Sequence, residues 1–133
     1  MKNLTQFLIE NPVDNLTDTV IVSARLAKFP FKIKGMSGTE FADYQKLATR
    51  ISRKNKGIEF DTKIFNELVV INNTVEPNFK DAETLKKANC LSPEQFLYKS
   101  LLAGEIAELA QRISALSGFD KTLEEEVEDA KNY

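Results

Sequence analysis

Histidine and tryptophan are absent from this chain of 133 residues, and cysteine occurs once, at Cys90. Without histidine there is no Ser-His-Asp triad, no imidazole proton shuttle and no His-ligated metal site. A single cysteine forms no internal disulfide, which suits a reducing cytosol. The sequence also offers no phosphate-binding loop, so we expect a protein that is not an enzyme and that needs no cofactor and no metal.

A long apolar run and a strong net charge are also missing. The opening stretch, MKNLTQFLIENP, contains an apolar run that is too short for a signal peptide, and we expect no membrane-spanning segment. The formal net charge of -2 gives no general attraction to nucleic acid. With 42% apolar and 29% charged residues, the composition is that of a soluble globular protein. The length suits one domain, 1–133.

The most informative stretch is residues 92–119, SPEQFLYKSLLAGEIAELAQRISALSGF. Ser92-Pro93-Glu94 is a typical helix start, and Ala103-Gly104-Glu105 is expected to break that helix. Gly118 is expected to end a second helix in the left-handed conformation, with Phe119 folded back as the hydrophobic partner of the cap. The second helix carries its apolar residues at helical spacing: Ile106, Leu109, Ala110, Ile113 and Leu116.

The first half of the chain predicts a helix followed by a β-hairpin. Residues 1–11 form an amphipathic pattern that Pro12 ends. Residues 19–26, TVIVSARL, are β-branched and alternate, and FPFKIK at residues 29–34 alternates as well. The few residues between them indicate an antiparallel hairpin, in which Pro30 must lie at a strand end or on an edge.

Four more helices are expected. A capping box of Ser37 and Glu40 starts one that runs to about Lys54 with Leu47 inward. Residues 58–60 form an extended connector or short strand. Asp61 or Thr62 caps the next helix, which Glu76-Pro77 ends and which we expect to be the most buried. Short helices follow over residues 81–88 and 122–133. We predict that five residues are buried together in a central core: Leu68, Ile71, Leu101, Leu109 and Ile113.

Three charged features invite a functional interpretation, and each has a simpler structural one. The basic residues Arg50, Arg53, Lys54 and Lys56 can track phosphates, but a solvated helix end explains them better. The acidic run in residues 124–129 lacks the alternating ligands and turn glycine of a calcium loop. Glu105 and Glu108 lie at helical spacing, yet nothing in the sequence indicates a raised pKa. Cys90 is expected to be a small packed residue.

The fold we predict is α+β and mainly α: one small domain with an antiparallel β-hairpin packed on about five or six helices. Residues 122–133 form a peripheral acidic helix with a thin apolar stripe. Phe79 follows Glu76-Pro77-Asn78 in a predicted loop, which makes it a candidate for contact with a partner. The candidate partner-binding residues are Phe79, Leu123, Val127, Glu124, Glu125 and Glu128.

The order of these signals resembles the XkdN-like tail assembly chaperones of PBSX-type phages and related contractile tail-like particles. The resemblance covers most of the chain and is specific mainly from Phe65 onward. It rests on the segments VEPNFKD, LLAGEIAEL, the pair Gly118-Phe119, and the closing AKN. The motif positions it marks as structural are Pro77, Gly104, Glu105, Gly118 and Phe119. Ile106 stands where the family pattern has an aromatic residue, and Ala103 where proline is common.

The resemblance implies a non-enzymatic assembly factor of the host bacterial cytoplasm. Such a protein binds and shields the tape measure protein while the tail tube assembles, and is absent from the mature particle. The tail tube protein is a second candidate partner, and a homo-oligomer is a further option. One alternative is a structural tail or baseplate component that stays in the particle. Another is a small nucleic-acid-binding regulator that uses residues 50–56.

Overall fold

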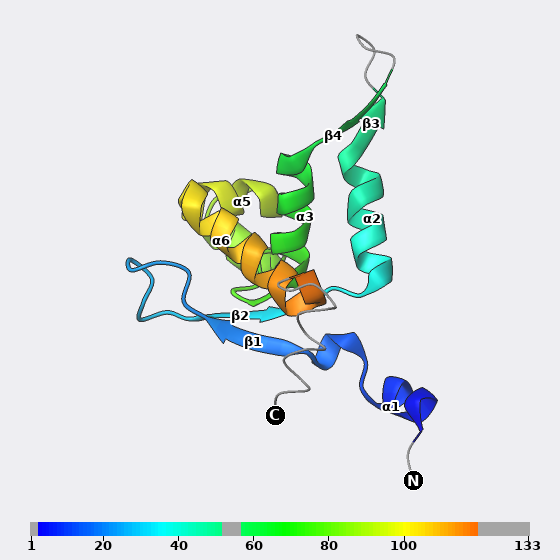
Figure 1. Cartoon of the computed structure of the whole chain (residues 1–133). Coiled ribbons are helices and arrows are strands. Elements are labelled where there is room, and N and C mark those ends of the chain that lie inside the picture. The colour runs from blue at the N-terminus through cyan, green and yellow to red at the C-terminus, as the bar shows by residue number, and fades with distance from the viewer. Residues whose placement is uncertain (1–2, 52–56, 120–133) are drawn as a thin grey trace.

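Strand β2 (Phe31–Lys34) lies at the centre of a three-stranded antiparallel sheet in this computed structural model, which describes residues 3–51 and 57–119 (Figure 1). β1 (Thr17–Val20) pairs on one side, with Thr17 opposite Lys34, and β5 (Thr74–Glu76) pairs on the other, with Ile33 opposite Thr74. Phe31 and Ile33 are buried because β2 alternates inward apolar and outward lysine residues. The predicted antiparallel hairpin is therefore confirmed.

Two features of the predicted hairpin are wrong. The first strand stops at Val20, and residues 21–30 form a long loop instead of a short turn. In this loop the amides of Leu26, Ala27 and Phe29 bond to carbonyls three residues back, so local turns satisfy the backbone in place of a ladder. The sheet also has a third strand, β5, whose residues we expected to continue a helix. Pro30 comes directly before β2, at a strand end as predicted.

The helix α2 (Gly38–Ala48) starts with the predicted capping box, in which Ser37 and Glu40 bond to each other's backbone amides. It ends earlier than predicted, because the chain turns into β3 (Thr49–Ile51), which pairs with β4 (Ile58–Phe60) in a two-stranded arm. The Asp61 amide donates to the Ala48 carbonyl at 2.8 Å and closes the base of that arm. Leu47, expected inward, is 65% exposed.

The helix α3 (Thr62–Asn73) is capped by Asp61, whose carboxylate accepts from the Ile64 amide at 3.1 Å. α4 (Ala82–Lys87) starts at Asp81 and ends with Asn89 in the left-handed region. α5 (Pro93–Ser100) has Ser92 as its cap, as predicted. The break before α6 (Ala103–Ser114) lies at Leu101 and Leu102, so Ala103, Gly104 and Glu105 belong to the first turn of α6 instead of breaking the helix.

Three short elements complete the described chain: α1 (Leu4–Glu10), the 3₁₀ turn η1 (Val13–Asn15) and the π-helical turn η2 (Ala115–Phe119). Gly118 has φ 101° and ψ 8°, so its predicted left-handed conformation is confirmed. In Figure 1, α3, α5 and α6 lie over one face of the sheet, α2 stands beside α3, and α1 projects away from the body.

The core joins the sheet to α3, α5 and α6. Ile33, Val70, Leu97, Leu109 and Ile113 are fully buried in it. Of the predicted core set, Ile71, Leu109 and Ile113 are buried, while Leu68 and Leu101 are partly buried and pack against the core. Cys90 is buried, as expected of a small packed residue. The predicted fold class, mainly helical α+β with a small antiparallel sheet, is confirmed.

Candidate functional site

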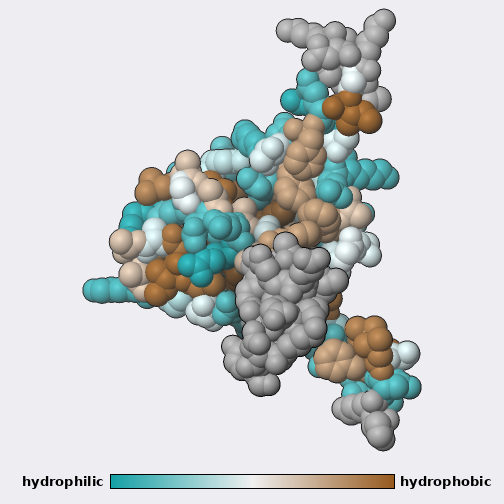
Figure 2. Space-filling view, in the orientation of Figure 1, coloured by the Kyte–Doolittle hydropathy of each residue, from teal (hydrophilic) through white to brown (hydrophobic). Residues whose placement is uncertain are grey.

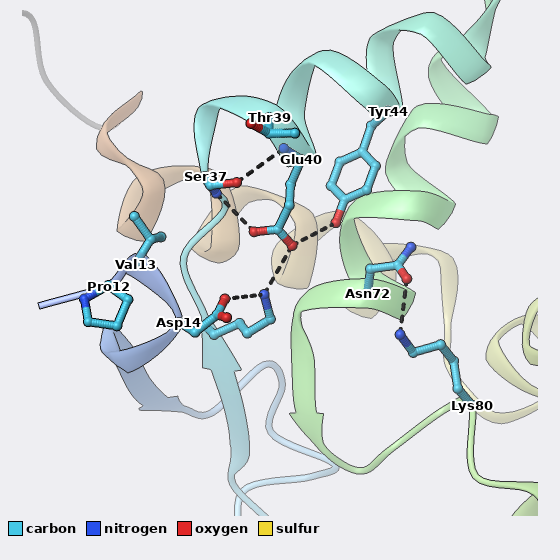
Figure 3. A pocket seen from close by; sticks show the side chains of 10 residues that line it. Pro12, Val13, Asp14, Ser37, Thr39, Glu40, Tyr44, Asn72 and Lys80 are labelled. Atoms are coloured by element: carbon cyan, nitrogen blue, oxygen red, sulfur yellow. Dashed lines mark hydrogen bonds and ion pairs between the residues drawn. The ribbon is translucent and has the colours of Figure 1, made fainter. Parts of the chain in front are cut away.

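An open polar pocket of ≈ 610 Å³ is lined by residues of η1, β2, α2 and α3 and by Lys80 (Figure 3). Lys34 Nζ lies 3.3 Å from Asp14 Oδ1 and 3.1 Å from Glu40 Oε2, so two carboxylates neutralise this lysine. On another side of the pocket, Lys80 Nζ donates to Asn72 Oδ1 at 3.1 Å. Lys34 is thus offset by two carboxylates, whereas Lys80 bonds to a neutral amide.

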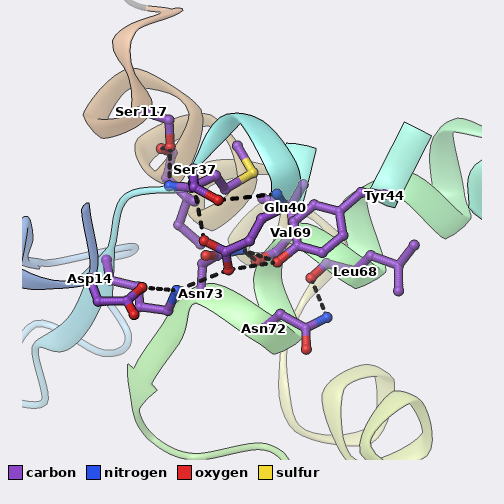
Figure 4. Close-up of polar contacts among 12 residues, drawn as sticks. Asp14, Ser37, Glu40, Tyr44, Leu68, Val69, Asn72, Asn73 and Ser117 are labelled. Atoms are coloured by element: carbon purple, nitrogen blue, oxygen red, sulfur yellow. Dashed lines mark hydrogen bonds and ion pairs between the residues drawn. The ribbon is translucent and has the colours of Figure 1, made fainter. Parts of the chain in front are cut away.

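Glu40 connects this pocket to the core (Figure 4). The Tyr44 hydroxyl donates to Glu40 Oε2 at 3.4 Å and accepts from the buried Asn73 Nδ2 at 3.1 Å. Burial raises the pKa of Tyr44 to about 12. Burial also pushes the pKa of Glu40 upward, but hydrogen bonds from Ser37 and Lys34 outweigh it and hold the pKa below its ordinary value. Tyr44 therefore stays protonated and Glu40 ionised near neutral pH, which suits a structural network and not proton transfer.

A second polar cluster joins the loop 21–30 to α6. The carboxylate of Glu105 is buried and accepts from Arg25 Nη2 at 2.7 Å, Arg25 Nε at 3.1 Å and Ser23 Oγ at 2.6 Å. It also accepts from the Leu102 amide at 2.8 Å. The hydrogen bonds from Arg25, Ser23 and Leu102 lower the pKa of Glu105 to about 2. A buried carboxylate with this many donors holds a loop in place and is no general base at neutral pH.

Four phenylalanines from four elements form a row on the surface, which we call the phenylalanine row: Phe60, Phe65, Phe41 and Phe119. The ring centroids of successive members lie 5.3, 5.6 and 5.0 Å apart. Phe60 is 50% exposed and Phe119 60% exposed, while Phe41 and Phe65 are half-buried between them. In Figure 2, tan and brown atoms cover the region between α2 and α3 up to the β3–β4 arm.

Two further groups of exposed apolar side chains lie on α1 and beside the loop 21–30. α1 has no buried residue, and its Leu4, Phe7, Leu8 and Ile9 are all more than half exposed. A hollow of ≈ 480 Å³ lies between the loop 21–30, the first residue of β2 and the end of α5. Its lining includes Phe29, which is 68% exposed, and Pro77, which follows a cis peptide bond.

The structure places the predicted site residues in different surroundings. Phe79 is 1% exposed and its ring packs 5.6 Å from that of Phe96, so it fills the core and offers no surface to a partner. The reason is that the loop before α4 folds inward, which sequence position alone does not show. Phe119 packs on Phe41 of α2, and Gly104 is exposed on α6. Leu123, Glu124, Glu125, Val127 and Glu128 lie outside the described residues.

The basic cluster is only partly described. Arg50 lies on β3, not on a helix, and its guanidinium is 3.6 Å from both Glu59 Oε2 and Asp61 Oδ2. Two carboxylates thus offset its charge, while Arg53, Lys54 and Lys56 lie outside the described residues. Across residues 3–51 and 57–119, no group of three or more acidic or cysteine side chains is placed to hold a metal ion. None of the helices in this part is long and apolar enough to cross a membrane.

Two clusters were not predicted from the sequence: the Arg25–Glu105 pair and the phenylalanine row. Arg25 and Glu105 are 80 positions apart, and the only local signal was a glutamate in the first turn of a helix. The phenylalanine row takes one ring from each of β4, α3, α2 and η2, so no periodicity within one element reveals it.

Comparison with known proteins bears on the fold and the family. The chain is similar to the crystal structure of the protein YqbN, with a TM-score of 0.67 and 21% sequence identity over 90% of this chain and 99% of the other. At this identity the likeness concerns the fold alone. No curated protein matches. The model of the phage XkdN-like tail assembly chaperone family matches residues 4–131. That match spans nearly the whole sequence, and the chain therefore belongs to the family of XkdN-like phage tail assembly chaperones.

Proposed function

We propose that this protein binds the tape measure protein of its phage or tail-like particle and shields it while the tail tube assembles. The observation that carries the proposal is the family match over residues 4–131, which assigns tail assembly. A tape measure protein is a long helical chain with much apolar surface, so its carrier needs exposed apolar side chains of its own. The α1 face and the phenylalanine row supply such side chains.

The chaperone acts by binding and release, without catalysis. Glu105, the most buried carboxylate of the described residues, is ionised and held by four donors, and Tyr44 is protonated near neutral pH. Neither group is suited to proton transfer at that pH. We place the protein in the host bacterial cytoplasm, where the tail is built, and outside the mature particle.

The acidic segment 122–133 is the other part of this proposal. The sequence pattern predicts a helix here with a thin apolar stripe of Leu123, Val127 and Ala130, and Glu124, Glu125 and Glu128 make the segment strongly negative. We expect it to contribute to capture and little to the stability of the domain. Deleting residues 122–133 should lower the thermal midpoint modestly and reduce capture of the tape measure protein much more. A deletion that unfolds the domain, or that leaves capture unchanged, removes this role.

Co-expression tests the proposal as a whole. The tagged chain is produced together with the tape measure protein and the tail tube protein of the same gene cluster, and each is assayed for solubility and co-purification. We expect the tape measure protein to become soluble and to co-purify, and mass spectrometry of purified particles to lack the chain. Detection of the chain in the particle at stoichiometric amounts supports a structural tail component instead. A salt-dependent DNA shift supports a nucleic-acid-binding regulator.

A further inference from the structure

The spacing of the phenylalanine row fits a helix laid along it. Successive ring centroids are separated by 5.3, 5.6 and 5.0 Å. The α-helix rises about 5.4 Å in each turn, so side chains one turn apart on a helix meet successive rings. Among the described residues, ring contacts join Phe60 to Phe65, Phe65 to Phe41 and Phe41 to Phe119, so the four rings follow one another from β4 to η2.

The size of the row also favours a single helix. A phenylalanine side chain has a surface of about 150–250 Å². Because two rings are about half exposed and the other two are largely buried, the row offers on the order of 300 Å² of apolar surface. A stable complex between two globular surfaces covers about 800 Å² on each partner, so the row alone is too small to hold a second copy of this chain. One apolar helix face laid on the row needs less area, and contact through one face of a helix is a known mode of peptide recognition.

The surroundings of the row leave it available to such a helix. At the β3–β4 end of the row, Arg50 is paired with Glu59 and Asp61, and on the first turn of α3 Lys63 lies 3.8 Å from Glu67, so the charges of these two basic residues are offset. The row itself is edged by α2 and α3, which pack on each other and are both anchored in the core through Tyr44, Val69 and Val70. A binding surface whose backbone is held by the core loses little conformational entropy when a partner binds.

We propose that the phenylalanine row is the binding site for one amphipathic helix of the tape measure protein, with apolar residues at positions i, i+4, i+7 and i+11. This inference rests on the proposed function and adds the surface and the partner's pattern. The apolar face of the helix covers the four rings, and its polar face stays in water. The recognition tolerates different sequences because it reads apolar spacing, which suits a carrier that must cover many successive segments of a long chain.

The test substitutes the two exposed ends of the row and compares them with an equally exposed phenylalanine elsewhere. Phe60→Ser and Phe119→Ser, singly and together, are made in the full chain, with Phe29→Ser as the matched control because Phe29 is 68% exposed and lies in the loop 21–30. Each is co-expressed with the tape measure protein. We expect capture to fall at least tenfold in the double variant and to stay within twofold for the control, with thermal midpoints of all variants close to that of the parent.

Photo-crosslinking identifies the occupant. A benzoylphenylalanine placed at position 60 or 119 should crosslink to apolar helical segments of the tape measure protein, and one at position 29 should not. If positions 60 and 119 crosslink only to residues 120–133 or to a second copy of the chain, the inference is overturned. Full capture by the double variant overturns the site and leaves the proposed function standing. If the parent chain itself captures no tape measure protein, the proposed function fails and the inference fails with it.

Discussion

Two regions of this molecule carry apolar side chains in amphipathic or alternating patterns, and the two differ in burial. In the body, Ile33 of β2, Val70 of α3 and Ile113 of α6 are fully buried. In the outer elements, α1 and the β3–β4 arm, Leu8 is 61% exposed, Ile58 76% and Phe60 50%. The outer elements have the same helical or alternating patterns as the inner ones. Amphipathic pattern therefore indicates a face that will be covered, but it does not say whether the chain itself or a partner covers it.

The body owes its burial to contacts between elements far apart in sequence. β5 pairs with β2 about forty residues away, as Ile33 opposite Thr74 shows, and α6 packs on α3. Among the described residues, the arm is built from the local pairing of β3 with β4, and its Phe60 ring contacts Phe65 of α3. A two-stranded hairpin without a covering surface is marginal by itself. The difference predicts that substitutions in the two regions have very different effects on stability.

The largest effect is expected in the body. Leu109→Ala removes a fully buried side chain, and we expect the free energy of unfolding to fall by about 2–5 kcal/mol. Leu8→Ala on α1 is the matched control, with an expected change within about 0.5 kcal/mol. Urea unfolding followed by circular dichroism measures both. Equal losses for the two variants contradict the division into a buried body and exposed outer elements.

The next effect concerns the link between the loop 21–30 and α6. The pKa of Glu105 lies at about 2, below its ordinary value of 4.5, because Arg25, Ser23 and Leu102 donate to its ionised form. A depressed pKa stabilises the folded state above the unfolded pKa, and that contribution is lost as the pH falls from about 4.5 to about 2. Glu105→Gln should lower the unfolding free energy at pH 7 and flatten this part of the pH profile.

Glu108→Gln is the control for this prediction, because Glu108 is bonded to Arg112 one turn along the same helix. Its stability at pH 7 should stay close to that of the parent, since an exposed pair of this kind contributes little. Parallel pH profiles for the parent and Glu105→Gln, measured by urea unfolding between pH 2 and pH 7, rule out the stabilising role of the Arg25–Glu105 pair.

A smaller effect is expected in η2, which follows α6. Gly118 has φ 101°, and an added Cβ meets nothing within 4 Å, so the cost of a side chain there is conformational and not steric crowding by neighbours. Gly118→Ala should lower the unfolding free energy by about 1 kcal/mol, and Gly118→Val by more. Gly104→Ala, in open space within the first turn of α6, should be neutral or slightly stabilising. A loss at Gly104 as large as that at Gly118 refutes the left-handed requirement.

The smallest effect is expected on the arm. Ile58→Ser removes a side chain that is 76% exposed, and the thermal midpoint should remain within about 2 °C of the parent value. Differential scanning calorimetry gives the midpoint. A drop in the thermal midpoint as large as that of Leu109→Ala means that the arm is covered in solution. The arm would then belong to the buried body and not to the outer elements.

Features that depend on a few neighbouring residues were predictable from the sequence. The caps at Ser37, Asp61, Asp81 and Ser92 accept from amides three residues on, and all four start the helices we expected. Helix ends were less predictable. α2 stops at Ala48 and α3 at Asn73 because the next residues pair as strands, and the pairing partners of β5 lie far away in the chain.

The sequence by itself determined the starts of α2, α3, α4 and α5, the left-handed Gly118, the antiparallel pairing of β1 with β2 and the lack of histidine chemistry, because each depends mainly on residue types close together in the chain. Only the tertiary structure decided that Phe79 is core, that Arg25 holds Glu105 and that Phe60, Phe65, Phe41 and Phe119 form one row. These outcomes depend on which distant segments pack together, and that choice belongs to the free energy of the whole fold and not to any one window of the sequence.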